Sequence, residues 1–118
     1  MSFRAEQHFK DMPEAISLIE QFLGNMDLTA YKADIKTQAA VERELQLVTE
    51  AAYRLKPEDE PLCPGPEWRE IRAMGNVLRH AYDRIENEAI WRTVTNDLPA
   101  LKQAVVKALA IHFPTSAS

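Results

Sequence analysis

Hydrophobic residues recur every three or four positions through most of the chain, a spacing that predicts amphipathic α-helices. The first helix is expected over about residues 4–24, and because Pro13 interrupts its pattern, it either begins near Pro13 or is kinked there. A second and longer helix is expected from Asp34, a capping residue, to Leu55. The core-facing positions of the two helices would be Phe9, Met12, Ile16, Ile19, Leu23, Val41, Leu45, Val48, Ala52 and Leu55.

The stretch PEDEPLCPGP, within residues 56–67, ends this helical pattern because it contains four prolines and one glycine. We expect the main loop of the protein here. A third helix should start at Trp68 and end around residues 83–87, where Asn87 could cap a short extra helix. The sequence Asn96-Asp97-Leu98-Pro99 then places a capping residue before a first-turn proline, which predicts the start of a last helix that stops before Pro114.

The third helix is predicted to have two distinct faces. Its packing stripe consists of Trp68, Ile71, Gly75, Leu78, Tyr82 and Ile85. Its polar stripe consists of Arg72, Asn76, Arg79, His80 and Asp83, which follow one another at steps that allow contact on a helix. Because glycine costs about 1 kcal/mol relative to alanine inside a helix, Gly75 indicates that another helix, of the same chain or of a symmetry mate, approaches closely there.

No segment alternates as a strand does, so the fold class is predicted to be all-α: one domain over residues 1–118, with four main helices and a short extra one. The 14 basic and 18 acidic residues give a net charge of −4, which argues against a protein that grips nucleic acid with its whole surface. A local site is still possible, because five of the eight arginines lie between Trp68 and Arg92. The simplest alternative is a solvated helix face with ion pairs.

Cysteine content and hydropathy argue against a disulfide-bonded, metal-binding, secreted or membrane-spanning protein. The single cysteine, Cys63, cannot form an internal disulfide, and the sequence offers no set of metal ligands, so we expect neither a metal nor a cofactor. The N-terminal segment lacks the apolar core of a signal peptide, and no apolar run is long enough to span a bilayer. We therefore expect a cytoplasmic protein that does not enter a membrane.

His80 is the histidine with a setting suited to catalysis. A histidine exchanges protons near neutral pH, so His80 could accept a proton from a ribose 2′-hydroxyl while a neighbouring arginine holds the phosphate. Such chemistry requires no metal. The alternative is that the arginine–histidine pair only decorates the surface. Tyr82 lies two residues from His80 and would point about 200° away on a regular helix, as a residue at the edge of the core would.

Two segments of the chain resemble the HepT-like proteins of the HEPN superfamily: DIKTQAAVERELQLVTEAAYRL and, after the proline-rich loop, WREIRAMGNVLRHAYDRIENEAIWRTVTNDLPALKQAV. The resemblance covers nearly the whole chain. It implies an all-α HEPN bundle that dimerises and that is encoded beside a minimal, MntA-like nucleotidyltransferase in a toxin–antitoxin module.

The functional motif of that family is an arginine, four to six residues, a histidine, any residue and a tyrosine, usually with an asparagine directly after the arginine. Three positions match it: Asn76, His80 and Tyr82. Gly75 occupies the place of the arginine, so Arg79 or Arg72 would have to substitute for it, either within one chain or across a twofold interface. The resemblance further implies that the nucleotidyltransferase neutralises the toxin by attaching AMP to the motif tyrosine, here Tyr82.

These observations leave two main hypotheses. The first is a metal-independent endoribonuclease toxin that acts on single-stranded RNA, with His80 as general base, Arg79 or Arg72 on the phosphate, and Asn76 and Tyr82 shaping the site. The second is a catalytically degenerate HEPN module that binds nucleotide or a partner nucleotidyltransferase. The missing arginine favours the second hypothesis, and His80 and Tyr82 favour the first. A helical dimer without a ligand is a third and simpler alternative.

Overall fold

The computed structural model describes residues 3–80 and 85–114, and it confirms the all-α prediction, with no strand in either range. Four long helices form the bundle: α1 (Phe3–Leu23), α3 (Ile35–Arg54), α4 (Trp68–His80) and α6 (Leu98–His112). The short elements are α2 (Leu28–Lys32), the 3-10 turn η1 (Glu60–Leu62), α5 (Asn87–Arg92) and the π-helical turn η3 (Thr93–Asp97). The four main helices and the short extra helix were therefore predicted correctly.

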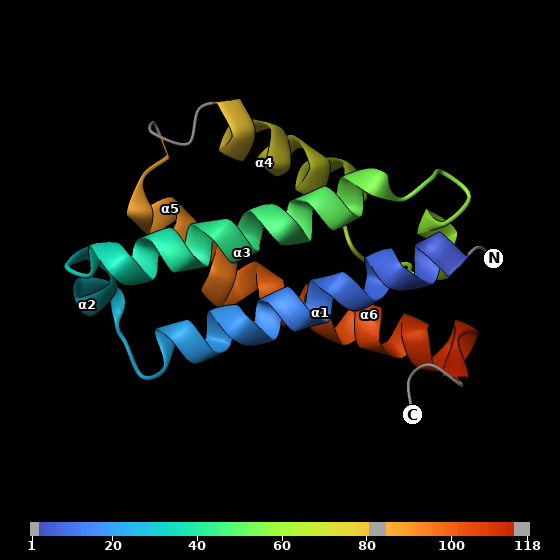
Figure 1. Ribbon diagram of the computed structural model, residues 1–118, viewed down its shortest axis with the longest axis horizontal. Coiled ribbons are helices and arrows are strands. Elements are labelled where there is room, and N and C mark those ends of the chain that lie inside the picture. The colour runs from blue at the N-terminus through green and yellow to red at the C-terminus, as the bar shows by residue number, and fades with distance from the viewer. Residues whose placement is uncertain (1–2, 81–84, 115–118) are drawn as a thin grey trace.

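Helix α3 is the centre of the bundle (Figure 1). It packs against α1 on one side and α4 on the other, and α6 packs against α1. The predicted core stripes of α1 and α3 are buried along their whole length. On α4, the described members of the packing stripe are buried or half-buried, and on α6 the buried side consists of Leu98, Leu101, Val105, Ala108 and Leu109. The apolar periodicity thus identified the interior of the protein.

Helix α1 continues through Pro13 instead of starting there, which decides between the two alternatives for its beginning. Proline has no backbone N–H and so removes one hydrogen bond within the helix. The buried residues on both sides of it, Met12 and Ile16, belong to one apolar stripe, and their packing keeps the helix continuous. Gly24 ends the helix in the left-handed conformation, with a φ of 52°, as expected for a glycine that follows a helix.

Helix α2 was not predicted from the sequence, which indicated no element between the first two long helices. Asp27 caps this helix by accepting a hydrogen bond from the backbone N–H of Ala30 at 2.8 Å. Its one buried side chain, Tyr31, lies against Trp91, with ring centroids 5.5 Å apart. A helix of five residues is too short to show a hydrophobic period, so its formation depends on this tertiary contact.

Residues 87–112 form one continuous helical run made of α5, η3 and α6. Two capping predictions are wrong here. Asn87 is the first residue of α5, while the extended residue Glu86 precedes it. Asp97 does not cap α6, because its backbone is itself helical and a capping residue needs an extended conformation. Pro99 does lie in the first turn of α6, as predicted. In the described ranges, no helix has both the length and the apolar character needed to cross a bilayer.

Candidate functional site

The polar face of α4 carries the site residues that the sequence analysis identified. Asn76, Arg79 and His80 are all exposed, and His80 is the last described residue of α4. The opposite side of the helix is fixed in the bundle at its start, where the Trp68 indole N–H donates to the carbonyl oxygen of Cys63 at 3.1 Å. The Trp68 ring also meets Phe9 of α1 edge to face, with centroids 6.3 Å apart. These contacts determine which face of α4 points away from the core.

Arg72 is engaged elsewhere, although it belongs to the same polar stripe. Its guanidinium forms an ion pair with Glu60 of η1, and both side chains are partly buried. Arg72 also precedes His80 by eight residues, which corresponds to about 12 Å along a helix axis. The structure therefore does not bring Arg72 together with His80.

Arg79 is held over the surface of α4 and α3 by two contacts. Its Nη2 donates to Oδ1 of Asn76 at 3.1 Å, and its Cζ lies 5.2 Å from the centroid of the Tyr53 ring. Side chains on a helix lean toward the N-terminal end, so the Arg79 guanidinium reaches back along α4 from its own Cα. The structure thus brings together the side chains of Asn76 and Arg79 from the predicted set. Arg79 is also the residue directly before His80 in the sequence.

Gly75 lies buried where α4 crosses α3. A Cβ atom at this position would be 2.8 Å from Cβ and 2.9 Å from Oγ1 of Thr49. The close approach inferred from this glycine is therefore real, and it involves a helix of the same chain. The same hypothetical Cβ would lie 3.5 Å from Nη1 of Arg79. The guanidinium of Arg79 therefore lies beside the place where a side chain of residue 75 would begin.

Three residues of this environment were not identified from the sequence: Thr49, Tyr53 and Glu60. Thr49 and Tyr53 lie on α3, 20 or more positions from their partners on α4, and no sequence pattern indicates such a contact. Glu60 could have been suspected, since it is an acid in the loop that precedes α4. Two predicted residues, Tyr82 and Asp83, lie outside the described residues. Within the described ranges, no three His, Cys, Asp or Glu side chains are grouped in a way that could hold a metal ion.

The described residues form an all-α bundle, and the exposed face of α4 carries an asparagine, an arginine and a histidine. The chain belongs to the ribonuclease HepT-like family, whose model matches residues 12–108.

Curated relatives agree with this assignment. A probable ribonuclease HepT of Thermococcus cleftensis is 36% identical over 97 residues, which cover 82% of this chain and 88% of that protein. A candidate RNase of Caldanaerobacter subterraneus subsp. tengcongensis is 30% identical over 98 residues, covering 83% and 87% of the two chains. A candidate RNase of Methanocaldococcus jannaschii is 25% identical over 95 residues, covering 80% and 87%. No solved structure gives a significant match.

Proposed function

We propose that this chain is a metal-independent endoribonuclease that cleaves single-stranded RNA, and that Arg79 takes the role of the arginine missing at position 75. The observation that carries the proposal is the placement of the Arg79 guanidinium beside Gly75, where it is held by Asn76 and lies over Tyr53. Membership of the ribonuclease HepT-like family supports the reaction class. The ion pair of Arg72 with Glu60 favours Arg79 as the phosphate-binding residue.

In the proposed reaction, His80 accepts the proton of a ribose 2′-hydroxyl as general base. The 2′ oxygen forms a bond to the adjacent phosphorus while the bond from phosphorus to the 5′ oxygen breaks. The products are a 2′,3′-cyclic phosphate and a 5′-hydroxyl, which takes its proton from water. Arg79 binds the phosphate oxygens in two parallel hydrogen bonds and stabilises the charge that grows on them. Asn76 keeps the guanidinium in place through its Oδ1.

The biological setting is part of the same proposal. The protein would act as a cytoplasmic homodimer and as the toxin of a HepT/MntA-type toxin–antitoxin module. An MntA-like nucleotidyltransferase would be its antitoxin and would attach AMP to Tyr82.

One observation favours the second candidate function, a catalytically degenerate HEPN module that binds nucleotide or the nucleotidyltransferase. Gly75 is closely packed against Thr49, so the side chain normally expected at this position in the family has no room here. In this case the polar face of α4 would bind a partner without cleaving RNA.

The test is cleavage of a labelled single-stranded RNA in EDTA by protein produced without its partner. We expect cleavage that falls at least about 100-fold in His80→Ala, the loss typical of a missing general base. Arg79→Ala should fall by about 100-fold or more, as when one charge-stabilising donor is removed. Arg72→Ala is the matched control on the same helix, and it should retain cleavage within a few-fold.

The other results would decide against parts of the proposal. Loss of cleavage in Arg72→Ala with retention in Arg79→Ala would show that the wrong arginine was assigned. No cleavage by the wild-type protein would favour the binding module, provided that intact-mass measurement shows no AMP on Tyr82. Melting curves of all variants distinguish catalytic losses from unfolding, and none is expected to shift much, because these side chains are exposed or partly exposed.

A further inference from the structure

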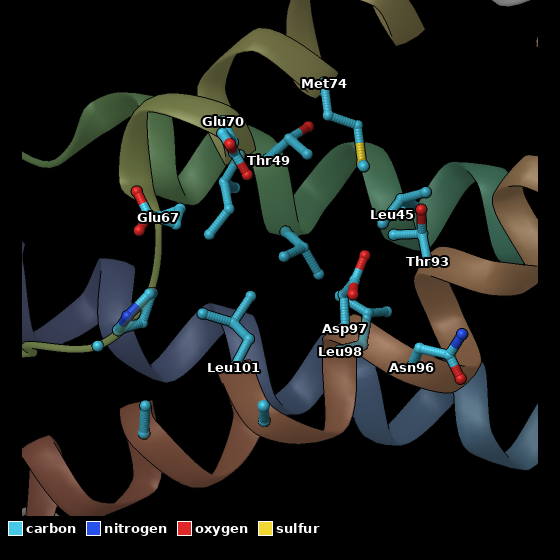
Figure 2. Close-up of a pocket in the computed structure, with 16 residues that line it drawn as sticks. Leu45, Thr49, Glu67, Glu70, Met74, Thr93, Asn96, Asp97, Leu98 and Leu101 are labelled. Atoms are coloured by element: carbon cyan, nitrogen blue, oxygen red, sulfur yellow. The ribbon is translucent and has the colours of Figure 1, made fainter.

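A cavity of about 480 Å³ opens between α3, the first half of α4, η3 and α6 (Figure 2). The three exposed site residues of α4 are not among the described residues that line it. Three carboxylates do line it, those of Glu67, Glu70 and Asp97, and they would repel the phosphates of a nucleic acid. The cavity therefore does not suit RNA. A strand bound at the candidate site would instead run over the exposed side of α4 and the neighbouring turn of α3.

Tyr53 is the aromatic side chain on that surface. It lies in the last turn of α3 and is 61% exposed, although its ring is large and mostly apolar. Its contact with Arg79 places it beside the exposed face of α4, which carries the site residues. An aromatic ring that remains open to water gains free energy when another flat ring stacks on it. Tyr53 is therefore available to a ligand of the candidate site.

The guanidinium of Arg79 lies over this ring and covers only part of it. Its Cζ is 5.2 Å from the ring centroid, and its Nη2 donates to Oδ1 of Asn76 at 3.1 Å. In the described part of the chain Arg79 forms no ion pair, so no acid neutralises its positive charge there. An arginine in this state binds phosphate oxygens through its parallel N–H groups. A phosphate-binding cation and an open aromatic ring thus lie together on one surface.

These two groups fit the two ends of a nucleotide. The phosphate suits the guanidinium, and bases of single-stranded nucleic acids stack on exposed aromatic side chains. Since a single ribose joins the base and the phosphate of a nucleotide, a phosphate bound to Arg79 brings an adjacent base within reach of Tyr53. A base inside a duplex is already paired and stacked on its neighbours. Only an unpaired base can therefore occupy this ring.

We propose that Tyr53 is a specificity-determining residue, which stacks an unpaired base adjacent to the phosphate that Arg79 binds. The inference rests on the proposed function, which places the scissile phosphate on Arg79. It adds the reason why the substrate is single-stranded. Every base has a flat π face, so the contact selects unpaired nucleotides without requiring a particular base.

The experiment measures cleavage of short 2′-O-methyl RNA strands that contain one unmodified ribonucleotide. Only one bond of such a strand has the 2′-hydroxyl that the reaction needs. Two matched strands lack a base, either that of the ribonucleotide or that of the next nucleotide. For the wild type, removal of one of these bases should raise KM at least about fivefold, the lower end for a base stacked on an aromatic ring.

Variants of Tyr53 assign this effect to the ring. Tyr53→Phe keeps the ring and should respond to the missing base as the wild type does. Tyr53→Leu should give nearly the same KM with and without the base. The matched control is Phe22→Leu, which changes an exposed aromatic residue of α1, on the other side of α3, and it should keep the wild-type response. Because Tyr53 and Phe22 are exposed, melting curves should shift little.

Two results would overturn the proposal. If Tyr53 only supports Arg79, Tyr53→Leu would slow cleavage of all strands by one common factor, and the missing base would cost it as much as it costs the wild type. If the ring instead contacts a second copy of the chain, Tyr53→Leu would weaken dimerisation in analytical ultracentrifugation and leave the response to the missing base unchanged.

A binding measurement separates this inference from the proposed nuclease activity. Fluorescence anisotropy is recorded with a labelled strand made only of 2′-O-methyl nucleotides, which cannot be cleaved, and with the same strand in a duplex. Tyr53→Leu should weaken binding of the single strand at least about fivefold and leave binding of the duplex unchanged. Binding that depends on Tyr53 in this way, without cleavage of any strand, would refute the nuclease and support the stacking. Cleavage that is indifferent to Tyr53 would support the nuclease and refute the stacking.

Discussion

Replacing Gly75 by alanine adds one methyl group at the closest approach of α3 and α4. The new Cβ would lie 2.8 Å from Cβ of Thr49, whereas carbon atoms pack best at about 3.5–4.0 Å. Cβ of Thr49 cannot move away by rotation about χ1, so the two helices must separate by roughly 1 Å at this point. Overpacking of this kind costs about 1–3 kcal/mol. Alanine gains about 1 kcal/mol over glycine inside a helix, so a net loss of about 1 kcal/mol in the free energy of unfolding is expected.

The assay is urea unfolding followed by circular dichroism. The matched control is Ala73→Gly, at an exposed position two residues earlier on the same helix, and it should cost about 1 kcal/mol from helix propensity alone. The double variant Thr49→Gly with Gly75→Ala moves the glycine to the opposite side of the contact. It should be more stable than the sum of the single variants predicts by at least about 1 kcal/mol.

Two results together would refute the reasoning. The first is a Gly75→Ala variant whose free energy of unfolding rises by as much as that of Ala73→Gly falls. The second is a double variant whose stability equals the sum of the two single effects. The result also bears on the functional motif. Gly75→Arg introduces the same Cβ atom, so restoring the family arginine should destabilise the protein unless Thr49 is replaced by glycine at the same time.

Three further predictions concern the core. Leu78 is 1% exposed, so Leu78→Asp should cost at least about 3 kcal/mol in urea unfolding, and a variant of normal stability would contradict the orientation of α4. The Tyr31 hydroxyl is buried and has no hydrogen-bond partner among the described residues, so Tyr31→Phe should keep or raise stability by about 1 kcal/mol at pH 7. Burial raises the pKa of Tyr31 from 10.0 to about 12, so between pH 10 and pH 12 the tyrosine loses its proton in the unfolded chain but keeps it in the folded protein. Over this range the free energy of unfolding should therefore fall more steeply for the wild type than for Tyr31→Phe. Equal pH profiles of the two proteins would contradict this. Burial also raises the pKa of Cys63 to about 11, so a thiol reagent should modify it at pH 8 only as the protein unfolds, and rapid modification of the native protein would contradict its burial.

The long helices could be predicted from the sequence because their signals are local. Asp34 is a case in point: its carboxylate accepts from the backbone N–H of Thr37 at 3.0 Å, so the capping residue named in advance does start α3. Asp97 and Asn87 also have a side-chain oxygen that could cap a helix, but they do not cap. Asn87 does not cap because the extended residue Glu86 already occupies the cap position, and Asp97 does not cap because its own backbone is helical. A capping residue in the sequence therefore marks a position where a helix could start, and the folded structure decides whether the backbone is extended at that residue.

The candidate site shows the same division. Its polar stripe follows from the helical period alone, and Asn76, Arg79 and His80 do lie exposed on α4. The different settings of Arg72 and Arg79 could not be predicted from spacing, because they depend on Glu60 and Tyr53, which come from other elements. The cavity next to η3 was also absent from the sequence analysis, since its walls come from four different segments.

The sequence by itself determined the all-α class, the main helices, the buried stripes and the polar face of α4, because each of these depends on the periodicity of one segment and on residues at its ends. Only the tertiary structure decided which helix approaches Gly75, which arginine pairs with Glu60 and which lies over Tyr53, and where a cavity remains between the helices. These features depend on contacts between side chains that are distant in sequence, such as Thr49 with Gly75 and Tyr53 with Arg79, and such contacts leave no period in the sequence.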